Sequence, residues 1–191
     1  MINIIEKAIQ DFCQEFIKNP YLCYTEHGIH ALFFNRLYNA LPEKDRYFNW
    51  MGHKVCVIQK EYPTATDLEK SQRQHWDISV IDTPPVSLSK TNSYDFLRLN
   101  SVVEFGMNAS SGHLKEDIRR MTRPDSNILN KYAVHLYRFS KNMSRRDISS
   151  KGSDIIKPDD VKRMVGDTDV KVYYAVADLM MSGESGVWVV G

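Results

Sequence analysis

The sequence predicts a mixed α/β domain, and three observations along the chain predict it. Apolar residues recur at helical spacing through the first 41 residues, β-branched or alternating runs follow from about residue 54, and helical spacing returns at about residue 110. The 191 residues suit one domain, 1–191, that can bury a core. A hydrophobic fraction of 42% lies in the globular range and argues against disorder.

Two helices are expected before the first strand. Residues 4–17 carry apolar side chains at spacings of three and four, and Pro20 follows this stripe. Thr25 is a good N-cap for a second helix that extends to Leu41. Glu26 then lies in the first turn of that helix, where a carboxylate interacts favourably with the helix dipole.

The middle of the chain is expected to form strands, then a helix and a further strand. The strand-like runs are VCVIQKEYP (55–63), HWDISVID (75–82) and LRLNSVVEFGMN (97–108). Residues 111–122 return to helical spacing, with Ser110 or Ser111 as the cap, and residues 131–139 predict a fourth strand.

The C-terminal part predicts shorter elements. Residues 140–154 are polar and indicate a long loop, and Pro158 opens a short helix, PDDVKRMV. Residues 170–178 predict another strand, and the terminal GVWVVG predicts a final strand, either complete or truncated.

Charge and cysteine content exclude several classes of protein. Lys plus Arg number 25 and Asp plus Glu 24, so a polycation that binds nucleic acid through net charge alone is excluded. The three cysteines form neither a CxxC pair nor a Cys/His ligand spacing, which predicts no disulfide framework and a reducing cytoplasm. No apolar run approaches the roughly 20 residues that a membrane span needs, and Glu6 and Asp11 interrupt any signal-peptide pattern. A cytoplasmic protein without a membrane partner is expected.

Two acidic residues stand inside strand-like runs. Alternation in SVVEFGMN places Glu104 on the strand face opposite Val103 and Phe105, and Asp77 lies in the run that should pair with this strand. A buried, unpaired carboxylate is costly, and two neighbouring carboxylates repel each other. A hard cation such as Mg²⁺ would allow both to stay ionised. The alternatives are a solvated Asp77 and an ion pair between Glu104 and Lys115, His75 or Arg73.

The order of these elements and acids resembles the PD-(D/E)xK nuclease-like superfamily over about residues 22–140. The resemblance rests on the helix with Glu26, the strands with Asp77 and Glu104, and the run VVEFGMNASSGHLKEDIRRM. It implies a restriction-endonuclease-like α-β-β-β-α-β core with a mixed central sheet, to which an extra N-terminal helix and a C-terminal extension, 141–191, are added. It also implies that Asp77, Glu104 and Glu26 hold Mg²⁺ or Mn²⁺, with the Phe105 carbonyl as a further ligand.

One position departs from the family pattern. The family lysine should follow Glu104 by two residues, where this sequence has Gly106. Lys115, early in the next helix, is the candidate substitute, and it would orient the attacking water through the space that Gly106 leaves. The alternative interpretation is a solvent-facing lysine on a highly charged helix.

Three hypotheses follow. The first is a Mg²⁺-dependent nuclease that acts on nucleic acid, with DNA as the expected substrate; Arg119, Arg120 and His75 would contact it, and a homodimer remains open. The second is a nuclease-fold protein that has lost catalysis and serves as a binding or scaffolding module, which Gly106 favours. The third is an α/β domain of other ancestry in which Asp77 and Glu104 are members of ion pairs.

Overall fold

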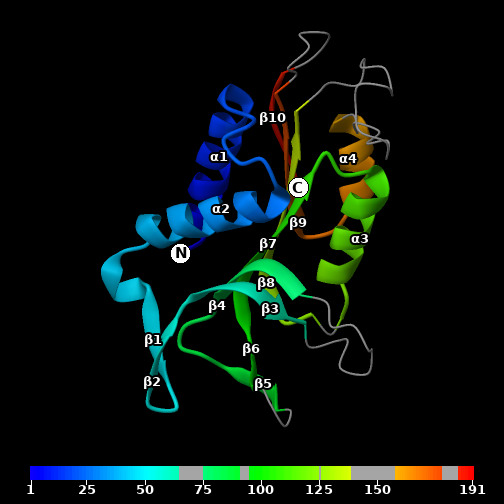
Figure 1. The fold of residues 1–191 in the computed structure, drawn as a ribbon. Helices are drawn as coiled ribbons and strands as arrows, with labels where there is room; N and C mark the ends of the chain where they lie inside the picture. The colour runs from blue at the N-terminus through cyan, green and yellow to red at the C-terminus, as the bar shows by residue number, and fades with distance from the viewer. Residues whose placement is uncertain (65–74, 91–94, 125, 139–157, 178–184) are drawn as a thin grey trace.

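In a computed structural model of the chain, the described residues include four helices and a six-stranded mixed sheet, and the helices lie on both sides of this sheet (Figure 1). The structure describes residues 1–64, 75–90, 95–124, 126–138, 158–177 and 185–191. The helices are α1 (Ile2–Lys18), α2 (Glu26–Ala40), α3 (Ser111–Met121) and α4 (Pro158–Val165), with a 3-10 turn at Glu43–Asp45. The strands are β1 (Tyr47–Trp50), β2 (His53–Cys56), β3 (Ile58–Pro63), β4 (His75–Ile81), β5 (Ser87–Lys90), β6 (Asp95–Leu97), β7 (Leu99–Met107), β8 (Ile128–Tyr137), β9 (Val170–Val176) and β10 (Gly186–Val190).

The central sheet has the strand order β10-β9-β8-β7-β4-β3. Strand β4 is antiparallel to both of its neighbours, β3 and β7, whereas β7, β8 and β9 are parallel and β10 is antiparallel to β9. The elements α2, β3, β4, β7, α3 and β8 follow the expected order, with the β5/β6 hairpin inserted between β4 and β7. The prediction that Glu104 lies on a central strand is confirmed, because β7 is flanked by β4 and β8.

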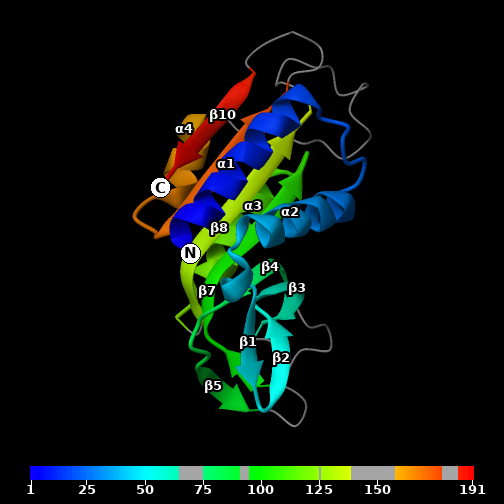
Figure 2. The same cartoon turned by 90° about the vertical axis from the view of Figure 1, so that its left-hand side faces the viewer.

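Helices cover both faces of this sheet. Figure 1 shows α1 and α2 on one side and α3 and α4 on the other, and Figure 2 shows α1 and α2 in front of the sheet. α1 packs on β8, β9 and β10, while α2 packs on β3, β4 and β7. α3 lies across β7 and β8, as the sequence predicted.

Side-chain caps start the two helices that matter for the site. Thr25 Oγ1 accepts a hydrogen bond from the Gly28 N–H at 3.1 Å, so α2 begins at Glu26 as predicted. Ser110 Oγ accepts from the His113 N–H at 3.4 Å and caps α3. These caps fix where Glu26 and His113, in the first turns of α2 and α3, enter the site.

The first expected strand, 55–63, is wrong at its start. Residues His53–Cys56 pair with β1 in a separate hairpin, and the sheet strand β3 begins at Ile58. The turn of this hairpin is Met51-Gly52, with φ of 50° and 83°. A two-residue turn of this kind needs positive φ at both positions, and methionine is an uncommon residue there, so the turn is hard to predict from local sequence.

The expected strand 97–108 also starts late. Leu97 belongs to the small β5/β6 hairpin, and β7 begins at Leu99. Between them, the Arg98 guanidinium donates to Asp82 Oδ2 at 2.8 Å and ties the hairpin to the end of β4.

The C-terminal residues extend the same core. Strands β9 and β10 continue the sheet from β8, and buried residues of α1, β8 and β9 belong to one hydrophobic cluster with those of β4 and β7. The final GVWVVG forms β10, and the helix opened by Pro158 is present as α4. The loop expected at 140–154 lies outside the described residues.

Candidate active site

Asp77 and Glu104 lie opposite each other where pairing between β4 and β7 gives way to side-chain contacts. The last backbone pair is Ile78 with Val103, and the next residue on each strand is the acid. The Asp77 N–H donates to Glu104 Oε1 at 3.1 Å, and the Phe105 N–H donates to Asp77 Oδ2 at 2.8 Å. Each carboxylate therefore binds a backbone N–H of the other strand, which places the two acids side by side as the sequence predicted.

Glu26 joins these acids from the other end of the sequence. It is the first residue of α2, and its Oε2 accepts a hydrogen bond from the Met107 N–H at 2.8 Å. The start of α2 is thereby held at the end of β7, one strand residue past Gly106. Glu26 is thus more than a surface charge that supports the helix cap.

The three acids open into one pocket with a volume of about 260 Å³. Its wall is made of residues from α2, β4, β7 and α3. They are Glu26, His75, Asp77, Glu104, Phe105, His113, Glu116, Asp117 and Arg120. The presence of Phe105 in this wall agrees with its expected place beside the acids.

Burial makes the two strand carboxylates difficult to ionise. Burial, together with the nearby charges of Glu26 and Asp117, raises the pKa of Asp77 to about 7, although the hydrogen bond from Phe105 opposes this rise. The pKa of Glu104 is also raised, first by burial and then by the charge of Asp77, while Arg120 acts in the opposite direction. A further cation in the pocket would favour the charged form of both acids.

Arg120 is the cationic partner of Glu104. Its guanidinium donates to Glu104 Oε2 at 3.2 Å and to the His75 carbonyl at 2.9 Å, and it lies 4.7 Å from the centre of the Trp76 ring. The sequence predicted a nucleic-acid contact for Arg120, but only 13% of its side chain is exposed. The structure therefore places Arg120 in the wall of the pocket, where it can act on the acids directly.

Lys115 does not approach Glu104. It is exposed and does not line the pocket, whereas α3 presents His113, Asp117 and Arg120 to it. An α-helix turns about 100° per residue, so a residue two positions from both His113 and Asp117 lies on the far side of the helix. The expected route of Lys115 into the site is wrong for this reason, and the interpretation as a solvent-facing lysine is confirmed.

The space beside Gly106 is filled by His135. These residues are register partners on the parallel strands β7 and β8, and a Cβ added to Gly106 would lie 2.7 Å from Cε1 of the His135 ring. The expected gap for an incoming lysine is therefore absent. Gly106 instead allows a fully buried histidine to pack against the strand.

Asp117 organises the side of the pocket next to His135. Its Oδ2 lies 3.3 Å from Nε2 of both His113 and His135, and the residue is 2% exposed. His135 Nδ1 lies 3.3 Å from the Tyr137 hydroxyl, which donates to the Ala109 carbonyl at 3.0 Å. Sequence reasoning missed this network, although the spacing of four between His113 and Asp117 was a signal that they share a helix face.

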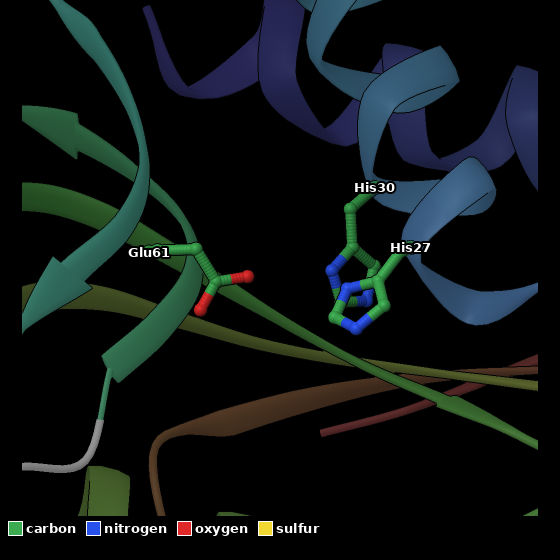
Figure 3. A group of neighbouring side chains, drawn as sticks. All are labelled: His27, His30 and Glu61. Carbon is green, nitrogen blue, oxygen red and sulfur yellow. The ribbon is translucent and has the colours of Figure 1, made fainter.

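A second group of polar side chains lies on the opposite side of Asp77. The ring of His30, one turn after Glu26 on α2, has its Nε2 3.5 Å from Asp77 Oδ2. Glu61 lies across from Asp77 on β3, because the pairs on either side of it are Lys60 with Ile78 and Tyr62 with Trp76. Figure 3 shows His27 and His30 pointing from α2 toward Glu61.

The remaining predicted contacts lie at the rim. His75 is exposed at the mouth of the pocket. Arg119 is exposed, and its guanidinium donates to Glu116 at 2.8 Å. Arg119 therefore lies at the surface of α3, whereas Arg120 lines the pocket.

Comparisons with protein-family models, with curated proteins and with solved structures find no match to this chain. In the part of the chain that the structure describes, no helix combines the length and the apolar character that a membrane crossing requires. The function is therefore argued from the site itself.

Proposed function

We propose that the protein is a Mg²⁺-dependent nuclease with a restriction-endonuclease-like fold, and that its substrate is DNA. The observation that carries the proposal is the reciprocal arrangement of Asp77 and Glu104 in one pocket, with Glu26 joining them from α2. Acids from three separate elements lie together in this pocket. An ordinary surface ion pair needs only one acid and one base, so it does not explain this cluster.

The donor set fits a hard divalent cation. Asp77, Glu104 and Glu26 offer carboxylate oxygens, and these are the ligands that Mg²⁺ and Mn²⁺ prefer. Burial raises the pKa of both strand acids, so keeping both of them ionised without a nearby cation is unfavourable. A bound Mg²⁺ would polarise a phosphoryl oxygen and lower the pKa of a water molecule.

The surrounding residues position the acids and supply positive charge. The N–H groups of Phe105 and Met107 fix Asp77 and Glu26, and the Asp77 N–H fixes Glu104. In this proposal Arg120 has the role that the sequence suggested for Lys115, because Arg120 lines the pocket and Lys115 does not. A guanidinium remains charged at neutral pH, so Arg120 would stabilise negative charge that develops on an attacked phosphate.

The topology supports the same class of protein. Two antiparallel steps, β3 to β4 and β4 to β7, are followed by a parallel step through α3 to β8, and α2 precedes them. This is the order that the resemblance implies for a nuclease core. The choice of DNA rests on that resemblance, with His75 and Arg119 at the rim as candidate phosphate contacts.

A binding module without catalysis is the second candidate. It is favoured by the His135 ring, which occupies the space beside Gly106, and by the pairing of Arg120 with Glu104. In that case the ion pair with Arg120, and no bound metal, would compensate the buried charge of Glu104.

Cleavage of supercoiled plasmid DNA separates these two candidates. The proposal expects nicking or linearisation with Mg²⁺ or Mn²⁺, none with a chelator, and a loss of at least about 100-fold in Glu104→Gln. Glu43→Gln is the matched control, since Glu43 is exposed and does not line the pocket, and it should keep the wild-type rate. No metal-dependent cleavage by the wild type would favour the binding module.

A further inference from the structure

His27, His30 and Glu61 form a compact group outside the carboxylate pocket. The two histidines are three residues apart on α2, with ring centroids 5.7 Å apart, and Glu61 belongs to the outermost sheet strand β3. One ligand atom from each residue lies within 4.8 Å of the others. In Figure 3 both imidazoles extend from α2 toward the side where the Glu61 carboxylate reaches from β3.

His30 is a buried side chain without a hydrogen bond. It is 2% exposed, and within the described ranges neither of its ring nitrogens has a hydrogen-bond partner. Its nearest acid, Asp77, has Oδ2 at 3.5 Å, which is too long for a good hydrogen bond. Buried polar groups are nearly always partnered, so an orphaned imidazole that faces two other ligand-type side chains points to a bound group.

We propose that His27, His30 and Glu61 bind a divalent transition-metal ion of the Zn²⁺ type, at a site separate from the carboxylate pocket. Two imidazoles and one carboxylate form a typical Zn²⁺ ligand set that leaves one open position. Mg²⁺ prefers oxygen ligands and would not be expected here. The inference does not depend on nuclease activity.

The geometry allows the ligands to close around an ion. Tetrahedral ligands at Zn–N distances of 2.0–2.1 Å lie about 3.3 Å from one another, so the observed separations must shorten by up to about 1.5 Å. The side chains of His27 and Glu61 are exposed and can rotate toward the ion, whereas the side chain of buried His30 would stay in place. The present neighbour of Glu61 is Lys60, at 3.3 Å in an exposed pair, which competes weakly for the carboxylate.

Zn²⁺ binding would tie the edge strand β3 to α2. Because the ligands come from both elements, a metal that binds the folded chain should raise its melting temperature as Zn²⁺ concentration rises. This gives a readout that is independent of any reaction.

Calorimetry with ZnCl₂ on the full chain tests the proposal. We expect one Zn²⁺ per chain, and visible absorption bands of a four- or five-coordinate site when Co²⁺ is used instead. His27→Ala and Glu61→Gln should each weaken Zn²⁺ binding by at least about 10-fold. Both positions are exposed, so the metal-free variants should keep the wild-type circular dichroism spectrum.

Two controls separate this site from its neighbours. His113→Ala removes a helix histidine from the other cluster of His and Asp side chains, in which Asp117 already contacts both rings, and it should keep Zn²⁺ binding. Asp77→Asn should lose Mg²⁺ binding and keep Zn²⁺ binding, so failure of the carboxylate site is distinguished from failure of this one. The proposal is overturned if the wild type binds no Zn²⁺, if His27→Ala binds it as the wild type does, or if only His113→Ala or Asp77→Asn abolishes binding.

Discussion

Burial acts in opposite directions on Asp77 and His30, two neighbouring side chains of the site. It raises the pKa of Asp77 from 3.8 to about 7 and lowers that of His30 from 6.5 to about 4. Between about pH 4 and pH 7 the folded chain therefore favours a neutral acid beside a neutral imidazole. The same two groups exposed to water would be oppositely charged between pH 3.8 and pH 6.5.

The first prediction concerns the pH dependence of folding stability. Asp77 binds its proton more tightly when folded, so its contribution is complete below pH 4 and is lost as pH rises toward about 7. His30 has the opposite slope between pH 4 and 6.5. The wild type is therefore compared with Asp77→Asn. Both proteins contain His30, so its contribution cancels in the difference between their free energies of unfolding.

We expect urea unfolding, with a chelator present, to show that the free energy of unfolding of the wild type falls between pH 4 and pH 7. Relative to Asp77→Asn, this fall should be on the order of 2–4 kcal/mol. Added Mg²⁺ should reverse this loss near pH 7, because binding favours the ionised acid. A pH-independent difference between the two proteins would show that Asp77 is ionised throughout.

The second prediction concerns which cation serves the site. Arg120→Ala removes the donor at 3.2 Å from Glu104 and should lower metal-dependent cleavage about 100-fold, the scale expected for one electrostatic donor. Lys115→Ala is the control, because Lys115 is exposed and outside the pocket, and it should keep full activity. Loss of activity in Lys115→Ala would restore the lysine assignment that the sequence suggested.

At the scale of elements, the packing of β7 on β8 explains the glycine that departs from the family pattern. Gly106 and His135 are register partners on parallel strands, so the His135 ring occupies the space that a side chain at position 106 would need. The third prediction is that Gly106→Ala destabilises the fold by about 1–3 kcal/mol through overpacking, as measured by thermal or urea unfolding.

Gly112→Ala is the matched control for that substitution. Gly112 is exposed in the first turn of α3, and an added Cβ there meets only Ser110 Oγ at 3.5 Å. Alanine should leave stability unchanged or raise it by up to about 1 kcal/mol. Equal stability of Gly106→Ala and wild type would show that His135 can move away at little cost.

The elements differ in how far the sequence could predict them. The acids Asp77 and Glu104 could be found because a carboxylate interrupts an apolar strand pattern. The N-cap Thr25 places Glu26 in the first turn of α2, but only the family resemblance assigned Glu26 to the site. His135 could not, because it meets Gly106 through the pairing of β8 with β7 and meets Asp117 through the packing of α3 on β8. The position of Lys115 next to Leu114 shows that it borders the core stripe of α3, but the sequence does not show which neighbouring face of the helix meets the pocket.

At the scale of the whole molecule, the sheet continues well beyond the predicted core of about residues 22–140. β8 forms a parallel pair with β9, and α1 packs on both strands, so the N-terminal helix and the C-terminal strand belong to the same core. The sequence could indicate strands at both places, but the pairing of distant strands depends on tertiary packing that local patterns do not contain.

The fourth prediction follows from this continuity. A chain that ends at residue 157 would expose the apolar edge of β8 and lose the buried side chains of β9, so it should show no cooperative thermal unfolding and should aggregate. A chain that ends at residue 177 removes only the edge strand β10 and should fold with reduced stability. Cooperative unfolding of the shorter chain would show that the first 157 residues fold independently.

Anomalous diffraction from a crystal soaked in Mn²⁺ tests most directly whether Asp77 and Glu104 share a cation. We predict a peak about 2.1–2.3 Å from an oxygen of each carboxylate, with Glu26 bound directly or through water, and no such peak in Asp77→Asn. An empty pocket in which Arg120 still pairs with Glu104, at Mn²⁺ concentrations well above those of cells, would contradict the metal site and with it the proposed nuclease.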